Sequence, residues 1–231
     1  MANINYANKE IIIKIVYYGP GMSGKTTNLQ VLHQMVPQDS ASKMISLATE
    51  QDRTLFFDLL PISLGSVKGF NTKFQLYTVP GQVYYNTTRK LVLNGVDGVV
   101  FVADSQQGKM PENIESLNNL KDNLSEYGID MAKFPVVLQY NKRDVANPIT
   151  IDEFQSTLNA AYNFPYSEAV AFKGQGLMET LKLISKITLQ RIGSKTSSAT
   201  TPAEPSAQPA NPATPPPQAS SEFFKNLQKK M

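Results

Sequence analysis

Short apolar runs alternate with segments whose apolar residues recur at helical spacing through most of this chain. The runs are rich in β-branched side chains and have the length of strands buried on both faces. They comprise residues 11–18, 44–48, 74–79, 98–103 and 136–140. Helices are predicted at residues 25–36, 114–124 and 177–184. Strands that alternate with amphipathic helices predict an α/β fold with a mostly parallel sheet and helices on both faces.

The composition changes sharply at Ser194. Seven of the 15 prolines lie in residues 194–231, among Ala, Ser, Thr and Gln. Such a segment buries too little apolar surface to offset the entropy of ordering it. We therefore predict a globular domain over residues 1–193, a disordered linker over 194–219 and a short amphipathic peptide over 220–231.

The C-terminal peptide would place Phe, Leu and Met on one side of a helix and lysines on the other. One interpretation is a peptide that folds when it docks on a partner or on the chain's own body. The other is a solvated end with incidental aromatic residues. Three lysines beside one short apolar side give weak interfacial affinity, so at most a peripheral association with membranes is expected.

The charge balance and residue usage exclude several classes of function. The 231 residues carry a formal net charge of +3, with one His and no Cys. This charge does not favour nucleic-acid binding, and the lack of Cys excludes a disulfide framework and a thiol nucleophile. No segment approaches the roughly 18 apolar residues of a membrane span, and the polar first ten residues do not resemble a secretory signal. A cytoplasmic protein is expected.

Residues 19–26 read Gly-Pro-Gly-Met-Ser-Gly-Lys-Thr, the pattern of a phosphate loop, between a predicted strand and a predicted helix. The glycines let backbone N–H groups face phosphate oxygens, and the following helix presents its positive end to the anion. Lys25 would supply a cation to the β- and γ-phosphates, and Thr26 a hydroxyl to Mg²⁺. The predicted phosphate contacts are Gly19, Pro20, Gly21, Met22, Ser23, Gly24, Lys25, Thr26 and Thr27.

A second motif, Asn-Lys-Arg-Asp at residues 141–144, follows the predicted strand 136–140. Ligands of open α/β sheets bind at this end of the strands. The Asp144 carboxylate can accept hydrogen bonds from N1–H and the 2-amino group of guanine, which adenine lacks, and such asymmetry discriminates strongly. Asn141 would face O6 and N7, and the Lys142 stem would lie along the base. Asp104, at the end of strand 98–103, is interpreted as structural.

These motifs resemble those of the Ras-like small GTPases, and among them the bacterial GTPases of gliding motility and cell polarity. The resemblance covers about residues 3–192. Its most specific stretches are residues 14–21, 52–58, 77–82 and 95–105. It implies a Ras-like three-layer α/β/α fold with a mostly parallel six-stranded sheet, one antiparallel edge strand and about five helices.

The same resemblance implies the activity and its partners. The body would bind Mg²⁺ and GTP and hydrolyse GTP slowly to GDP. A GTPase-activating partner of the Roadblock/LC7 type, an exchange factor, and motility or polarity effectors are implied. A position at a cell pole in the GTP state is implied as well.

The third motif of the family is Asp-x-x-Gly-Gln, and this chain has Thr78-Val-Pro-Gly81-Gln82. Gly81 can give its N–H to the γ-phosphate, and Gln82 can orient the attacking water. Thr78 carries no charge, so it cannot be the carboxylate that supports Mg²⁺ through water. Asp52 and Asp58 are the candidate substitutes.

The first switch of the family matches residues 53 and 54. Thr54 would close on Mg²⁺ and the γ-phosphate. Arg53 matches an arginine finger carried by the GTPase itself, which would stabilise transition-state charge once a partner presses the loop inward. A surface ion pair of Arg53 with Asp52 or Glu50 is the alternative.

Three further positions carry weaker expectations. Aligned on Gly176, the fifth motif of the family falls on residues 170–172, where Ala171 can still give its N–H to guanine O6 and Phe172 either covers the base or packs. Close approach of the γ-phosphate and Gln82 is expected to leave no room for a side chain at Gly21, so that Gly21→Val binds GTP but barely hydrolyses it. Tyr84 and Tyr85 are interpreted as part of a partner surface, with packing on the neighbouring helix as the alternative.

Two other classes of function remain open at this point. A P-loop ATPase or kinase would share the phosphate loop, although residues 141–144 argue against it. A scaffold that holds GTP without hydrolysing it would be consistent with Thr78.

Overall fold

The fold is seen in a computed structural model that describes residues 3–37, 39–48, 56–67 and 69–197. Within these ranges the strands are β1 (Asn3–Asn5), β2 (Glu10–Tyr18), β3 (Ile45–Ala48), β4 (Phe56–Val67), β5 (Phe70–Thr78), β6 (Gly98–Asp104), β7 (Val136–Asn141) and β8 (Tyr166–Glu168). The main helices are α1 (Lys25–Met35), α2 (Asn86–Leu93), α3 (Met110–Glu126) and α5 (Leu177–Ser197). Shorter helical turns are η1 (Val83–Tyr85), η2 (Met131–Lys133), α4 (Ile151–Glu153), η3 (Phe154–Leu158) and η4 (Ala171–Lys173).

The described strands form one sheet in the order β3-β4-β5-β2-β6-β7-β8, with β1 paired to β2. From β5 to β8 all neighbouring strands are parallel. The pairs β1–β2, β3–β4 and β4–β5 are antiparallel. The predicted α/β fold with a mostly parallel sheet is confirmed, but the sheet has eight strands rather than six and more than one antiparallel strand.

The main addition to the sheet is β4, which the apolar pattern does not reveal. Pro61 and Gly65 interrupt this segment, and both residue types are depleted in strands. β3 pairs only with the first residues of β4, from Phe56 to Leu59, so Pro61 lies beyond that pairing. There β4 faces residues 40–42, and the Ser42 N–H donates to the Pro61 carbonyl oxygen at 3.1 Å, so the proline removes only its own donor from this pairing.

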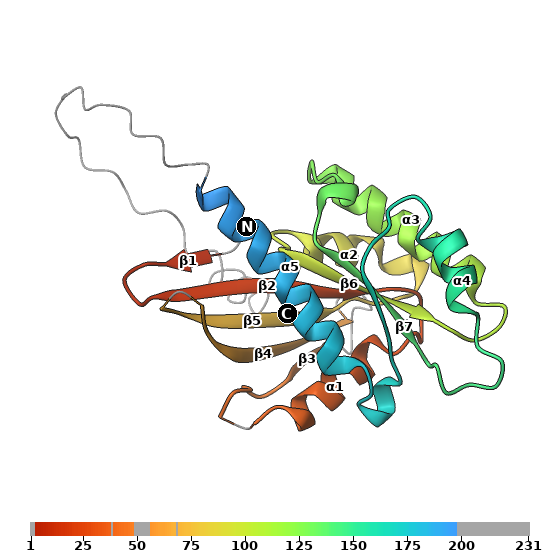
Figure 1. The fold of residues 1–231 in the computed structure, drawn as a ribbon, viewed down its shortest axis with the longest axis horizontal. Coiled ribbons are helices and arrows are strands. Elements are labelled where there is room, and N and C mark those ends of the chain that lie inside the picture. The colour runs from red at the N-terminus through yellow and green to blue at the C-terminus, as the bar shows by residue number, and fades with distance from the viewer. Residues whose placement is uncertain (1–2, 38, 49–55, 68, 198–231) are drawn as a thin grey trace. The chain divides into compact units, whose positions relative to one another are not determined.

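Helices cover both faces of the sheet, as Figure 1 shows. On one face α1 and α5 pack through Leu29, Leu32 and Leu181 against residues of β2, β6 and β7. On the other face α2 and α3 pack through Leu93 and Leu120. Because successive side chains of a strand point to opposite faces, the fully buried β6 supplies both cores.

The parallel strands bring the predicted motifs to one edge of the sheet. In register, Tyr17 of β2 is opposite Thr78 of β5, and Asp104 of β6 is opposite Asn141 of β7. The phosphate loop, the third motif and the base motif therefore follow neighbouring strand ends, where α/β sheets bind ligands.

The last helix, α5, extends through Ser197, so the helix continues four residues past the boundary expected at Gly193. The chain divides into a unit of residues 1–197 and a second unit of residues 198–231. The rest of the predicted linker and the C-terminal peptide lie outside the described residues. None of the described helices is long and apolar enough to span a membrane.

Candidate nucleotide-binding site

The phosphate loop joins β2 to α1 through backbone conformations that favour glycine. Gly19 and Gly24 have φ angles of 139° and 101°, in the region that L side chains rarely adopt. A Cβ added at Gly19 would lie 3.1 Å from the carbonyl carbon of Val102, and one at Gly24 would clash with the Asn141 amide. The loop is thus a backbone cradle with no room for side chains at these positions, as anion binding by N–H groups requires.

Lys25 begins α1 and is buried beneath the loop. Its Nζ donates hydrogen bonds to the carbonyl oxygens of Gly19 at 2.9 Å and Pro20 at 2.6 Å. Burial, together with the smaller effect of the positive charge of Arg89, lowers the pKa of Lys25 to about 7. A phosphate group beside Nζ would restore the charged form, because an opposite charge favours it.

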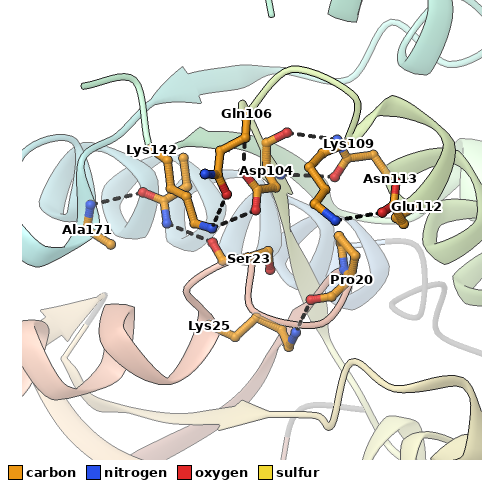
Figure 2. A network of polar contacts seen from close by, with 11 residues as sticks. Pro20, Ser23, Lys25, Asp104, Gln106, Lys109, Glu112, Asn113, Lys142 and Ala171 are labelled. Atoms are coloured by element: carbon orange, nitrogen blue, oxygen red, sulfur yellow. Dashed lines mark hydrogen bonds and ion pairs between the residues drawn. The ribbon is translucent and has the colours of Figure 1, made fainter. Parts of the chain in front are cut away.

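Asn141 connects the base motif to both neighbouring loops. Its Nδ2 donates to the Ser23 carbonyl oxygen at 2.8 Å, and its Oδ1 accepts from the Ala171 N–H at 2.9 Å. Figure 2 labels Ala171 and Ser23, whose backbone groups are the two partners of this amide. Ser23 lies in the phosphate loop and Ala171 in η4. The buried Asn141 side chain therefore connects these two segments with the base motif.

Lys142 is held in place by acceptors that follow β6. Its Nζ lies 2.6 Å from Oδ2 of Asp104 and 2.9 Å from Oε1 of Gln106, as Figure 2 shows. Asp104 is 2% exposed, and its backbone N–H and C=O are both bonded to the Asn113 side chain. Asp104 therefore contributes to the site by orienting Lys142, a role that its interpretation as a structural residue did not include.

The proposed base reader, Asp144, lies beside a cation from η4. Its Oδ2 is 3.8 Å from Nζ of Lys173, which in turn lies 5.2 Å from the ring centroid of Phe172. Phe172 is exposed, so it is not a core residue. The neighbouring Arg143 pairs with Glu168 at 2.9 Å and not with Asp144.

Asp58 of β4 places a carboxylate beside Thr78, which has none. Its Oδ2 accepts hydrogen bonds from the hydroxyls of Thr26 at 2.7 Å and Thr78 at 2.9 Å. Its backbone N–H also donates to the Thr78 hydroxyl at 2.9 Å, and Ser46 donates to its Oδ1 at 2.7 Å. Of the two candidates offered by the sequence, Asp58 is therefore placed beside the predicted metal ligand, whereas Asp52 lies outside the described residues.

This oxygen cluster fits a magnesium ion. A cavity of about 490 Å³ is bordered by Thr26, Ser46, Asp58 and Thr78 together with Gly81 and Gln82. Mg²⁺ prefers oxygen ligands and is bound through one or two carboxylates and the phosphates of its substrate. No group of three or more acidic, His or Cys side chains surrounds a metal position in the described ranges, so the substrate would complete the coordination.

Gly81 presses directly against the phosphate loop. A Cβ added at Gly81 would lie 2.5 Å from Cα of Gly21 and 2.6 Å from the carbonyl carbon of Pro20. A Cβ at Gly21 would meet only the carbonyl carbon of Gly81, at an ordinary 4.0 Å. The protein itself therefore restricts Gly81, whereas the expected crowding of Gly21 by the γ-phosphate and Gln82 stays a prediction. Gln82 is exposed and borders the cavity.

Arg53 and Thr54 lie outside the described residues, so their roles stay predictions. The other predicted residues gather at the strand ends. Met22 is exposed, whereas Ser23 is fully buried below the loop.

A phosphate loop joined by one buried amide to a guanine-type base motif, on this sheet, defines a Ras-like GTPase. The sequence matches the ADP-ribosylation factor family over residues 1–188, and the chain belongs to that family. It is 55% identical, over 192 residues, to the mutual gliding-motility protein MglA of Myxococcus xanthus. That match covers 83% of this chain and 98% of the relative.

Proposed function

We propose that this protein is a molecular switch that binds Mg²⁺ and GTP and hydrolyses GTP slowly to GDP and phosphate. The observation that carries the proposal is the Asn141 side chain, which bonds to both Ser23 and Ala171. This amide fixes the distance between the phosphate loop and the base motif, as a nucleoside di- or triphosphate requires. The family match supports guanine as the base.

The reaction is phosphoryl transfer to water. Gln82 orients the water, and Lys25 and Arg53 offset the charge that develops on the transferred group. Mg²⁺, when bound, would neutralise charge on the β- and γ-phosphates. Thr26 and Thr54 would hold it directly, and Asp58 would accept hydrogen bonds from its waters in place of the usual Asp at position 78.

The output of the switch is conformational. The γ-phosphate would hold Thr54 and the Gly81 N–H, and its loss would release both segments. The close packing of Gly81 on Gly21 supports this coupling, because a phosphate at this loop must displace or engage Gly81.

The biological role that we propose is control of cell polarity and of gliding or type IV pilus motility. The likeness to a mutual gliding-motility protein supports it. The partners would be an MglB-like Roadblock/LC7 GTPase-activating protein, an exchange factor, and motility or polarity effectors. The protein would be cytoplasmic and enriched at a cell pole in the GTP state. The C-terminal peptide would dock on a partner or on its own body.

The main alternative is a scaffold that holds GTP with little hydrolysis. Thr78 favours it, because its hydroxyl cannot replace the carboxylate that normally supports Mg²⁺ through water. Asp58 weakens this argument, since its carboxylate lies 2.9 Å from the Thr78 hydroxyl. A P-loop ATPase is disfavoured by Asp144, because adenine has neither the N1–H nor the 2-amino group from which this carboxylate would accept hydrogen bonds.

Single-turnover hydrolysis of GTP by the full chain, with and without an MglB-like protein, tests the proposal. We expect slow intrinsic turnover and acceleration by the partner of about 10³-fold or more, as arginine fingers provide. Arg53→Ala and Gln82→Ala should each remove most of the acceleration while GTP binding persists. Glu50→Ala is the matched control and should keep normal rates.

No acceleration, with both variants equal to the unmodified protein, would favour the scaffold.

Fluorescent fusions of the unmodified protein and of Gln82→Ala test the cellular role. The Gln82→Ala protein should stay at the pole longer because it remains in the GTP state. A uniform distribution of both proteins would contradict the polar position.

A further inference from the structure

A second cavity, distinct from the metal cavity, runs between α2 and α3. This groove has a volume of about 700 Å³. One wall comes from the segment that leads into α2, with Tyr84, Asn86 and Arg89. The other comes from α3, where Glu112, Glu115, Asn119 and Asp122 recur at helical spacing and so share one side of the helix. The groove ends at Gly21, Gly81 and Gln82, beside the proposed reaction centre.

The groove is acidic. It is bordered by four carboxylates and by two cationic side chains, those of Arg89 and Lys109. Lys109 pairs with Glu112 at 2.7 Å, and Lys142 pairs with Asp104 at 2.6 Å. Glu115 and Asp122 are exposed and have no ion-pair partner in the part of the chain that the structure describes.

A buried hydroxyl on this groove lacks a partner. Ser116 borders the groove and is 6% exposed, yet its Oγ makes no hydrogen bond to any described residue. Buried polar atoms in proteins are nearly always hydrogen-bonded, so an unpartnered one points to a group that is not present. Ser116 lies four residues after Glu112 and three before Asn119, so it shares one side of α3 with these two groove residues.

The walls of the groove are tied together and to the phosphate loop. Asn123 donates to Oδ1 of Asn86 at 2.9 Å and of Asn119 at 3.0 Å, which joins α2 to α3. The hydroxyl of Tyr18, the residue directly before Gly19, bonds to Asn119. A shift of Gly81 and Gln82 on nucleotide exchange would therefore change the end of the groove while its walls stay fixed.

We infer that this groove binds an arginine-bearing segment of a partner protein, in a manner that depends on the bound nucleotide. A guanidinium would lie between Glu115 and Asp122 and donate to the Ser116 hydroxyl. Arginine fits because its planar fork gives several donors to carboxylates at once. Tyr84, which is 89% exposed at the rim, would stack on the guanidinium or on an apolar neighbour. The nucleotide dependence rests on the proposed switch function.

The test is fluorescence anisotropy of the full chain with two labelled peptides. One is Gly-Leu-Arg-Leu-Leu-Arg-Gly, and the other replaces both arginines by citrulline, which has nearly the same shape without the charge. We expect the arginine peptide to bind at least about tenfold more tightly, which corresponds to about 1.4 kcal/mol. Raising the salt concentration from about 0.05 M to about 0.3 M should weaken binding of the arginine peptide, since exposed charges are screened.

Charge reversal separates the groove from the rest of the acidic surface. Glu115→Lys and Asp122→Lys should each weaken the arginine peptide about tenfold or more. Glu153→Lys, an exposed acidic residue of α4 outside the groove, should leave it within about twofold of the unmodified affinity. Ser116→Ala should weaken only the arginine peptide. Equal effects of the three charge reversals, or equal affinity of the two peptides, would overturn the proposal.

Two further outcomes are informative. Displacement of the arginine peptide by a synthetic peptide of residues 220–231 would reassign the groove to the chain's own C-terminus and overturn the assignment to a partner. Equal affinity in the GDP form and with a non-hydrolysable GTP analogue would refute the nucleotide dependence. Loading with either nucleotide is measured separately, so a protein that binds the peptide but no guanine nucleotide would contradict the proposed function instead.

Discussion

Asp58 is the residue on which the proposed magnesium site depends. Its carboxylate reaches the hydroxyls of both Thr26 and Thr78, so a charge that relatives of the Ras type carry at position 78 is provided from the adjacent strand. With the carboxylate at Asp58 in place of position 78, the oxygen cluster stays together although the carboxylate comes from another strand. A site can therefore retain its chemistry when one motif residue is replaced.

Asp58→Asn should raise the Mg²⁺ concentration needed to slow GDP release by about 10- to 100-fold, as changes in outer metal partners do. The measurement is the GDP dissociation rate as Mg²⁺ is titrated. Asp52→Asn, the other candidate, is the matched control and should behave like the unmodified protein. The opposite ranking of the two variants would assign the metal to Asp52.

Lys25 should make nucleotide affinity depend on pH. Burial lowers the pKa of Lys25 to about 7 in the free protein, and bound phosphates would raise it. A group whose pKa rises on binding contributes fully to the affinity below its pKa in the unbound protein. This contribution is lost as the pH increases above that pKa. GDP affinity should therefore fall between about pH 7 and pH 8.5, by up to about tenfold per pH unit.

Isothermal titration calorimetry in buffers of different ionisation enthalpy would detect the proton taken up at about pH 8. Lys25→Arg keeps its charge at these pH values, so it should bind GDP more weakly but with little pH dependence. A flat pH profile of the unmodified protein would show that Lys25 is already charged when the site is empty.

Gly81 is the position where the third motif and the phosphate loop come closest. Gly81→Ala would place a methyl group 2.5 Å from Cα of Gly21, so the two backbones must separate. Single-turnover hydrolysis should fall about tenfold or more, as misplacement by about 1 Å costs up to about 10²-fold. Gly21→Ala, whose Cβ has an ordinary contact, should cost less. If Gly21→Ala is the slower variant, the crowding depends on the γ-phosphate instead.

At the scale of elements, α2 and α3 are joined by a buried polar cluster of Tyr18, Asn86, Asn119 and Asn123. Asn123 is 1% exposed and donates to the other three side chains. Burial raises the pKa of Tyr18 to about 12, so its hydroxyl remains protonated and can donate to Asn119. This cluster fixes the segment that follows Gln82 onto the body.

Asn123→Ala should lower the free energy of unfolding by about 1–3 kcal/mol, because it removes three hydrogen bonds from a buried cluster and leaves the Tyr18 hydroxyl oxygen without this donor. Urea unfolding at a fixed GDP concentration measures this change, since bound ligand also stabilises the folded state. Asn118→Ala, at an exposed position of α3, is the control and should change stability by less than about 0.5 kcal/mol. Equal stability losses would show that the cluster is not stabilising.

The sequence predicts the elements whose apolar residues recur with a clear period and misses those that are defined by pairing with another strand. The strands and helices around the phosphate loop follow from apolar periodicity, and the loop itself from its glycines. β4 was missed because Pro61 and Gly65 obscure the pattern. The contact of Asp58 with Thr78 depends on the antiparallel register of β4 on β5, and the contact of Asn141 with Ser23 joins residues far apart in the chain. No local pattern encodes either contact.

At the scale of the whole molecule, the described residues of the unit 1–197 bring the phosphate loop, the third motif and the base motif to one edge of the sheet, whereas Arg53 and Thr54 lie outside the described residues. Two cavities meet at Gly81 and Gln82: the oxygen-lined one beside Asp58 and the acidic groove between α2 and α3. A change at the γ-phosphate would therefore reach both the reaction centre and a partner surface. This shared boundary is the physical basis for a switch.

The central claim, a site built for guanine nucleotides, is tested most directly by the dissociation constants of GDP, ADP and xanthosine diphosphate. The full chain should bind GDP at least about 10³-fold more tightly than ADP, since sites that hydrogen-bond a base discriminate by about 10⁴–10⁵. Asp144→Asn should weaken GDP and strengthen xanthosine diphosphate, whose 2-carbonyl accepts from the new amide. Similar affinity for GDP and ADP, or no change in base preference on Asp144→Asn, would contradict the claim.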